Sequence, residues 1–228
     1  MKFTLALIFI LSFISCKKEK TAAMDEEIVT VPYSEATYQL VFTLNWQSPQ
    51  FAVPPNVHVT ALVGMVHSKD TTLWSPGSQA TKGIEDVAEI GNTVVINVEL
   101  DSILSEGKAL SKFMISPPLV TDSTETILDF NTSFSCFSFA SMIAPSPDWF
   151  MGVHDYDLFK NNKWVADTII NILLYDAGTE DGDIFNYDNP ATSPQQPISF
   201  LTPLNAMVLA NGNKSIDAIG TIHFRKTR

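Results

Sequence analysis

Prolines separate short apolar stretches along this chain, and this alternation constrains the fold more than any other feature. The intervening stretches alternate apolar and polar residues and are rich in Val, Ile, Phe and Thr; they span 38–46, 57–65, 93–100, 134–143, 167–175 and 215–224. Many of the 13 prolines fall between them, at Pro54 and Pro55, Pro117 and Pro118, Pro145 and Pro147, and Pro194 and Pro197. Because an alternation of period two matches a half-buried strand, and proline is excluded from central strands, we predict strands joined by turns.

Short strands at this spacing predict an all-β fold, an antiparallel β-sandwich. Helical patterns are confined to 83–90 and 102–109, so we expect one or two short helices. A hydrophobic content of 45% in 228 residues is enough for the core of one domain. The sequence has no internal repeat, and we place the sandwich domain at residues 35–228.

The first fifteen residues are typical of a lipoprotein export signal. Lys2 supplies a positive start, and the apolar run 3–14 is shorter than the roughly 20 residues of a membrane-spanning helix. The run ends in Ser15 and Cys16, and a small residue directly before a cysteine resembles a bacterial lipobox. Cleavage there would let Cys16 carry several acyl chains, which anchor a protein stably. The alternative is an ordinary secretory signal with an incidental cysteine.

Residues 16–34 would then form a lipidated cysteine and a flexible tether, because they are polar and lack a buried-face pattern. Cys16 and Cys136 are the only cysteines, so a lipidated Cys16 leaves no disulfide within the chain. Cys136 lies among aromatic residues and is expected to be a buried thiol. We expect a lipid-anchored protein of a bacterial cell envelope, held in the outer membrane on its periplasmic or surface face.

The charge balance excludes nucleic acid as a partner. The chain has 14 basic and 25 acidic residues, a formal net charge of −11. Such a surface repels phosphate backbones, and no basic cluster interrupts it within the predicted domain. Contact with a membrane is therefore expected through the lipid anchor.

Two aspartates stand in rigid turns at the ends of predicted strands. Asp148 follows Pro145 and Pro147, and Asp176 opens the Gly-containing turn 176–179. The strand 134–143 leads into the first turn, and the strand 167–175 leads into the second, so both aspartates should lie at the same end of the sheet. Carboxylates held in this way can build a calcium site in a β-sandwich. The alternative is turn chemistry, in which the side chains cap local backbone amides.

Four segments, in order, resemble the N-terminal domain of the spondin family. They are Tyr38 to Trp46; Leu62 to Ser68 with Leu73-Trp74, Gly83 and Ala88-Glu89-Ile90-Gly91; Pro145 to Val153 with Leu158 and Trp164; and Asp176 to Thr179 with Gly182 and Pro194-Gln195. The resemblance implies a C2-like sandwich that binds Ca²⁺ through Asp148 and Asp176.

The resemblance also implies a third acidic ligand, and counting back along the chain places it at Asp129. Asp129 precedes the end of the strand 134–143 by about 14 residues, which is over 40 Å if the chain is fully extended at ~3.3 Å per residue. A fold-back at Asn131-Thr132-Ser133 would be needed to bring Asp129 to the other two. The acidic residues that crowd behind Asp176 lack the spacing of an EF-hand, so we predict a solvated loop there; they are Glu180, Asp181, Asp183 and Asp188.

The resemblance implies adhesion or ligand recognition at the cell surface, with a protein or glycan partner, and not catalysis. The four histidines form no zinc-spaced pair, and we find no set of nucleophile, base and orienting group. Two alternatives stay open. A carbohydrate-binding module would expose aromatic side chains such as Trp74 or Trp149. A calcium-stabilised glycan hydrolase would need two carboxylates facing each other across a cleft.

The lipobox interpretation predicts that Cys16→Ala abolishes fatty-acid labelling and releases the protein from the membrane fraction, because the acyl chains lose their attachment atom. Labelling with a palmitate analogue followed by fractionation measures both effects. Cys136→Ala is the matched control and should remain labelled and membrane-bound. A Cys16→Ala protein that still carries the label would contradict the interpretation.

Overall fold

Strands dominate the structure, as the period-two patterns predict. The computed structural model describes residues 32–46, 51–52, 54–116 and 122–228. The strands are β1 (Glu35–Leu44), β2 (His58–Val59), β3 (Leu62–His67), β4 (Ala109–Ile115), β5 (Ser123–Asn131), β6 (Cys136–Ala144), β7 (Trp149–Asp157), β8 (Phe159–Lys160), β9 (Lys163–Trp164), β10 (Asp167–Asp176), β11 (Ser199–Phe200) and β12 (Gly220–Lys226). The helices are α1 (Lys82–Ile90), α2 (Val94–Ser105) and α3 (Met207–Ala210).

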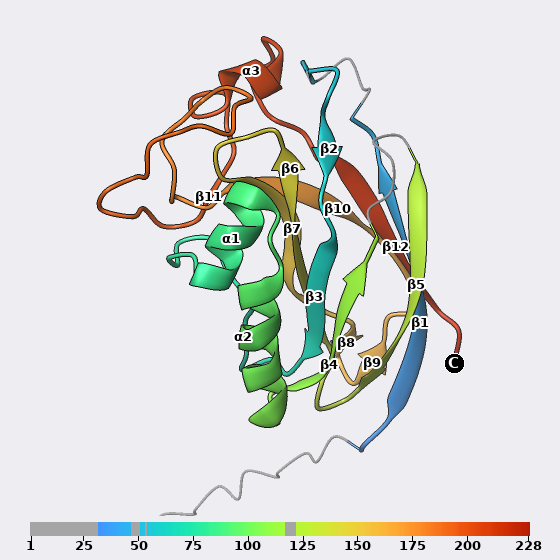
Figure 1. Cartoon of the computed structure of the whole chain (residues 1–228). Helices are drawn as coiled ribbons and strands as arrows, with labels where there is room; N and C mark the ends of the chain where they lie inside the picture. The colour runs from blue at the N-terminus through green and yellow to red at the C-terminus, as the bar shows by residue number, and fades with distance from the viewer. Residues whose placement is uncertain (1–31, 47–50, 53, 117–121) are drawn as a thin grey trace, which may run out of the picture. The chain divides into compact units, whose positions relative to one another are not determined.

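One antiparallel sheet runs in the order β4-β3-β6-β7-β10-β12-β1-β5, with β2 added to β6 and β11 added to β10. The sheet curls so that its two halves face each other across an aromatic core (Figure 1). Phe137 of β6 lies 5.2 Å from Phe224 of β12, and Phe139 lies 5.6 Å from Phe42 of β1, measured between ring centroids. The predicted all-β sandwich is confirmed.

Helices α1 and α2 cover the outer face of the half-sheet that contains β3, β6 and β7 (Figure 1). They bury a second apolar cluster, in which Ile84 and Val87 of α1 belong with Val63 of β3 and Phe150 of β7. Thr81 caps α1, since its side-chain oxygen accepts a hydrogen bond from the Ile84 amide. Helix α1 ends at Gly91, which has a φ of +66°. This helix therefore starts and stops where its local sequence dictates.

The predicted strand 93–100 is wrong, because residues 94–100 belong to α2 and Thr93 is the N-cap residue of that helix. Ile96 and Leu100 are buried, whereas Val94 and Val98 are about two-thirds exposed. The two buried positions are four apart, a spacing that fits one helix face as well as one strand face. Packing on α1 decides for the helix over the β-branched residues' preference for strands. The second predicted helical stretch, 102–109, contains only the end of α2, and β4 begins at Ala109.

The predicted export signal and the lipidated Cys16 lie outside the described residues. Within the part of the chain that the structure describes, no helix is long and apolar enough to cross a lipid bilayer. Cys136 is buried, as expected of a structural thiol.

Glu99 of α2 fastens the start of α1, and its removal should loosen the helical layer. Its carboxylate accepts hydrogen bonds from the Gly83 amide at 2.9 Å and from the Thr81 hydroxyl at 2.7 Å. Hydrogen bonds to charged groups contribute roughly 1.5–3 kcal/mol each. Because Glu99 is only half-buried and water replaces part of the loss, Glu99→Ala should lower the free energy of unfolding by about 2 kcal/mol in urea titrations. Val98→Ala, the neighbouring exposed position, is the control and should change stability by less than about 0.5 kcal/mol. Equal effects of the two substitutions would contradict this role.

Candidate functional site

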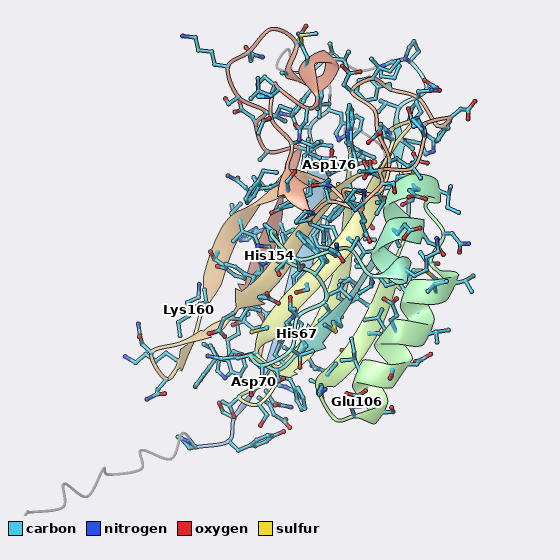
Figure 2. All side chains as sticks on the ribbon, turned by 90° about the vertical axis from the view of Figure 1, so that its left-hand side faces the viewer. His67, Asp70, Glu106, His154, Lys160 and Asp176 are labelled. Atoms are coloured by element: carbon cyan, nitrogen blue, oxygen red, sulfur yellow. The ribbon has the colours of Figure 1, made fainter. Side chains whose placement is uncertain are left out.

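The structure brings Asp148 and Asp176 side by side, as the predicted strand directions require. Asp148 directly precedes β7, whose first residue, Trp149, pairs with Asp176 at the end of β10. The amide of Ala177 donates to the carbonyl of Asp148 at 3.1 Å. We call this part of the sandwich the aspartate end. Figure 2 shows Asp176 at the opposite end of the strands from Asp70 and Glu106.

The Asp148 side chain is fully buried and organises the loop after β10. Its Oδ2 accepts hydrogen bonds from the amides of Thr179 at 2.6 Å and Glu180 at 3.1 Å, and from the Thr179 hydroxyl at 3.3 Å. Its Oδ1 is buried and has no hydrogen-bond partner among the described residues. Burial raises the pKa of this carboxyl despite the three donors. Turn chemistry therefore accounts for one oxygen of Asp148 and leaves the other unsatisfied.

Asp176 lies in a similar environment at the edge of an open depression. Its Oδ1 accepts from the Gly178 amide at 2.8 Å. Gly178 has a φ of +74°, and a β-carbon there would lie 2.2 Å from the Gln196 carbonyl oxygen, so this turn requires glycine. Burial, and then the charge of Asp148, raise the pKa of Asp176 to about 7. Two carboxyl groups of the same sign thus oppose each other's ionisation at the aspartate end.

The structure adds Glu180 and Glu89 to this environment. Glu180 belongs to the predicted solvated loop, but its amide donates a hydrogen bond to Asp148, and burial and the charge of Glu89 raise its pKa to about 7. Burial also raises the pKa of Glu89, at the end of α1. Glu89 is distant in sequence, and only the packing of α1 brings it here.

Asp129, the third predicted ligand, lies at the other end of the sandwich. It pairs across β5 and β1 with Thr37, whose hydroxyl donates to Asp129 at 2.6 Å. The aspartate end lies at the other end of β1, where Leu44 pairs with Gly220 of β12. The expected fold-back exists, since Asn131 accepts from the amides of Ser133 and Phe134. It turns the chain at the end remote from Asp148 and leaves Asp129 there.

Two surface depressions flank the loop after β10. The larger, of about 500 Å³, is lined by Asp176, Gly178, Glu180, Asp181, Gly182, Asp183, Thr192, Gln196 and Asn205. The smaller, of about 290 Å³, is lined by Glu85, Glu89, Thr179, Glu180, Asn189, Ala191, Thr192 and Gln195. Among the residues with described positions, no three His, Cys, Asp or Glu side chains are arranged as they stand to hold a metal ion. The carboxylates share a region without forming a finished coordination sphere.

Side chains considered for other functions are buried. His67 is fully buried, with Nδ1 2.8 Å from the Ser68 carbonyl oxygen and Nε2 2.8 Å from the Ser138 hydroxyl. Trp74 and Trp149 are also buried, so neither provides the exposed ring that a carbohydrate-binding module would need. Trp74 instead packs edge-to-face on Phe150 and Tyr175.

Comparison with known proteins identifies similar chains over most of this domain. The family model described as Spondin_N matches residues 36–210. Spondin-2 of Rattus norvegicus is 28% identical over 205 residues, which cover 85% of this chain and 62% of the relative. Spondin-2 of Homo sapiens is 32% identical, covering 73% of this chain and 53% of the relative, and Spondin-1 of Gallus gallus is 33% identical, covering 75% and 22%. This chain spans less than two thirds of the length of each of these relatives.

The raised pKa values predict that, without divalent cations, the aspartate end loses stability as pH rises. Between about pH 4 and pH 7 the folded state holds more protons on Asp176 and Glu180 than the unfolded state does, so the free energy of unfolding should fall through this window. Asp176→Asn removes one of these groups and should flatten the fall, measured by urea unfolding at pH 5 and pH 8 in chelator.

The pH dependence of the variant must be compared with that of the unmutated chain, because His67 also contributes to it. Burial lowers the pKa of His67 from 6.5, and this makes the free energy of unfolding rise with pH in the acid range. Asp129→Asn, at the other end, is the control and should keep the unmutated pH dependence. An Asp176→Asn protein with that same pH dependence would show that the carboxyl group ionises freely in the fold.

Proposed function

Because the chain belongs to the spondin N-terminal domain family, we propose that its aspartate end is a calcium-stabilised recognition surface of a non-enzymatic adhesion or ligand-binding protein. The observation that carries this proposal is the buried Oδ1 of Asp148, to which no described residue donates a hydrogen bond. A buried, unsatisfied carboxylate oxygen is costly, and a cation is the partner that would remove the cost.

The donor set fits a hard cation with oxygen ligands. Asp148 and Asp176 would supply carboxylate oxygens from adjacent strands, and Glu180 would supply a third from the turn that Asp148 organises. Ca²⁺ accepts six to eight oxygens in flexible geometry, whereas Mg²⁺ requires a nearly regular octahedron and gives up its water reluctantly. The described side chains do not form a complete coordination sphere in their present positions, so binding would draw the loop carboxylates together.

The ion's contribution would be electrostatic. Neutralising Asp148 and Asp176 would remove the mutual repulsion that raises the pKa of Asp176 and would lock the turn 176–180 against β7. A fixed turn presents its neighbouring loops in one arrangement, and such pre-organisation favours recognition of a partner.

The position of the aspartate end suits a protein tethered by its N-terminus. Strand β1 begins at Glu35, which pairs with Asn131 at the end of the sandwich remote from Asp176. With a lipid on Cys16, the tether would approach the domain from that remote end. The attachment point would then leave the aspartate end free to bind a protein or glycan partner of the cell envelope.

Calcium should raise the unfolding temperature of the full-length chain, and Mg²⁺ should raise it less. A ligand that binds only the folded state stabilises it by about 2.7 kcal/mol at 100 times its dissociation constant. Asp148→Asn and Asp176→Asn should remove most of this shift, because the amide keeps the shape and loses the charge. Glu180→Gln should reduce it. Differential scanning calorimetry with and without chelator measures each effect.

Asp129→Asn and Asp183→Asn are the matched controls, one at the far end of the sandwich and one in the acidic loop. Both should keep the calcium shift. An unmutated chain whose unfolding temperature is indifferent to calcium, with no heat of binding in titration calorimetry, would refute the metal proposal.

A further inference from the structure

The aspartate end combines a strong negative charge with exposed apolar side chains. Residues 176–217 contain six acidic residues and one basic residue, so this segment holds nearly half of the chain's net charge of −11. The same segment holds five of the large apolar side chains that are exposed in the described part of the chain; they are Ile184, Tyr187, Phe200, Leu204 and Met207. Figure 1 shows β11, α3 and their loops grouped at this end. Exposed apolar groups in a polar rim mark interaction surfaces.

The most exposed of these side chains is held by a fastened turn. Leu204 is 96% exposed. The turn is fixed on one side by the Leu201 amide, which donates to the Leu174 carbonyl at 3.0 Å, and is closed by the Thr202 amide, which donates to the Asn205 side chain at 2.6 Å. The chain therefore presents Leu204 to solvent from a defined position, and Met207 follows it on α3 at 65% exposure.

An apolar groove adjoins the acidic depression at this turn. The groove encloses about 430 Å³, and Leu201, Pro203, Leu204 and Ile216 supply its apolar lining. Thr202, Ser215 and the basic Lys214 complete the lining, so the groove suits an apolar side chain and the cationic side chain belongs in the depression. Asn205, the next residue after Leu204, lines the acidic depression together with Asp181 and Asp183. Consecutive residues of one turn, Leu204 and Asn205, thus line an apolar groove and a carboxylate-lined depression.

We propose that this junction docks a basic polypeptide segment of a partner protein, with an apolar side chain in the groove and a Lys or Arg side chain in the acidic depression. Charge complementarity selects this partner, because the surplus of carboxylates repels anionic lipid surfaces, nucleic acids and acidic proteins. Apolar and Arg anchors are the residues that contribute most to protein interfaces. The inference rests on the proposed function and names the chemistry of its partner.

The proposal is tested with a fluorescent ten-residue peptide of alternating Leu and Arg, titrated with the Cys16→Ala chain and followed by anisotropy. Two peptides of the same length, one alternating Leu and Glu and one alternating Ser and Arg, are the controls. The Leu–Arg peptide should bind at least tenfold more tightly than either control peptide. Equal binding of the Leu–Glu peptide would overturn the charge complementarity, and equal binding of the Ser–Arg peptide would overturn the role of the groove.

Variants locate the contact. Leu204→Ser combined with Met207→Ser, and Asp181→Asn combined with Asp183→Asn, should each weaken Leu–Arg binding about tenfold. Val98→Ser on α2 and Asp70→Asn at the opposite end are matched exposed controls and should leave binding unchanged. Equal effects of the controls and the test variants would show unspecific attraction and overturn the proposal.

Calcium separates this inference from the metal proposal. Peptide binding that persists in saturating calcium supports the docking surface, because Asp181 and Asp183 remain available. Complete displacement of the peptide by calcium would assign the depression to the metal and overturn the docking inference. If the chain binds no calcium in calorimetry but still binds the Leu–Arg peptide, the docking surface stands and the metal proposal falls.

Discussion

The buried carboxylate of Asp148 is the constraint on which the aspartate end depends. One oxygen gathers two amides and a hydroxyl of the turn after β10, and this fixes the turn against the start of β7. The other oxygen has no hydrogen-bond partner in the part of the chain that the structure describes. A fully buried carboxylate with three donors on one oxygen and none on the other is a partly satisfied network, which is costly unless a further group completes it.

The rest of the fold places groups around this carboxylate. Pairing of β7 with β10 brings Asp176 beside it, and the tight turn at Gly178 returns the chain so that the Glu180 amide reaches it. Helix α1 adds Glu89 from the outer layer. The position of α1 depends in turn on Glu99 of α2, which binds the first turn of α1. Glu99 therefore helps to position Glu89, and with it the negative charge at the aspartate end, from elsewhere in the helical layer.

The same arrangement divides the acidic segment after β10 into two pairs of carboxylates. Asp176 and Glu180 face the interior charge of Asp148 and ionise with difficulty. Asp181 and Asp183 line the outer part of the depression beside the apolar turn at Leu204. In our proposals, Asp176 and Glu180 bind a cation, whereas Asp181 and Asp183 bind the basic side chain of a partner. A single loop could thereby couple a stabilising ion to a recognition surface.

The sequence by itself determined the all-β class, half of the strands and the shared end of Asp148 and Asp176, because these follow from local alternation, proline punctuation and strand direction. It did not predict β4, β5 or β7, three strands of the main sheet. The capped boundaries of α1 were also largely readable. Alternation could not decide between strand and helix at 93–100, where Ile96 and Leu100 suit either, and packing on α1 decided. Counting along the chain misplaced Asp129, because the fold-back at Asn131 lies at the remote end of the sheet. Only the tertiary structure brought Glu89 and Glu180 to Asp148, because a carboxylate's environment depends on the chain segments packed around it and not on its neighbours in sequence.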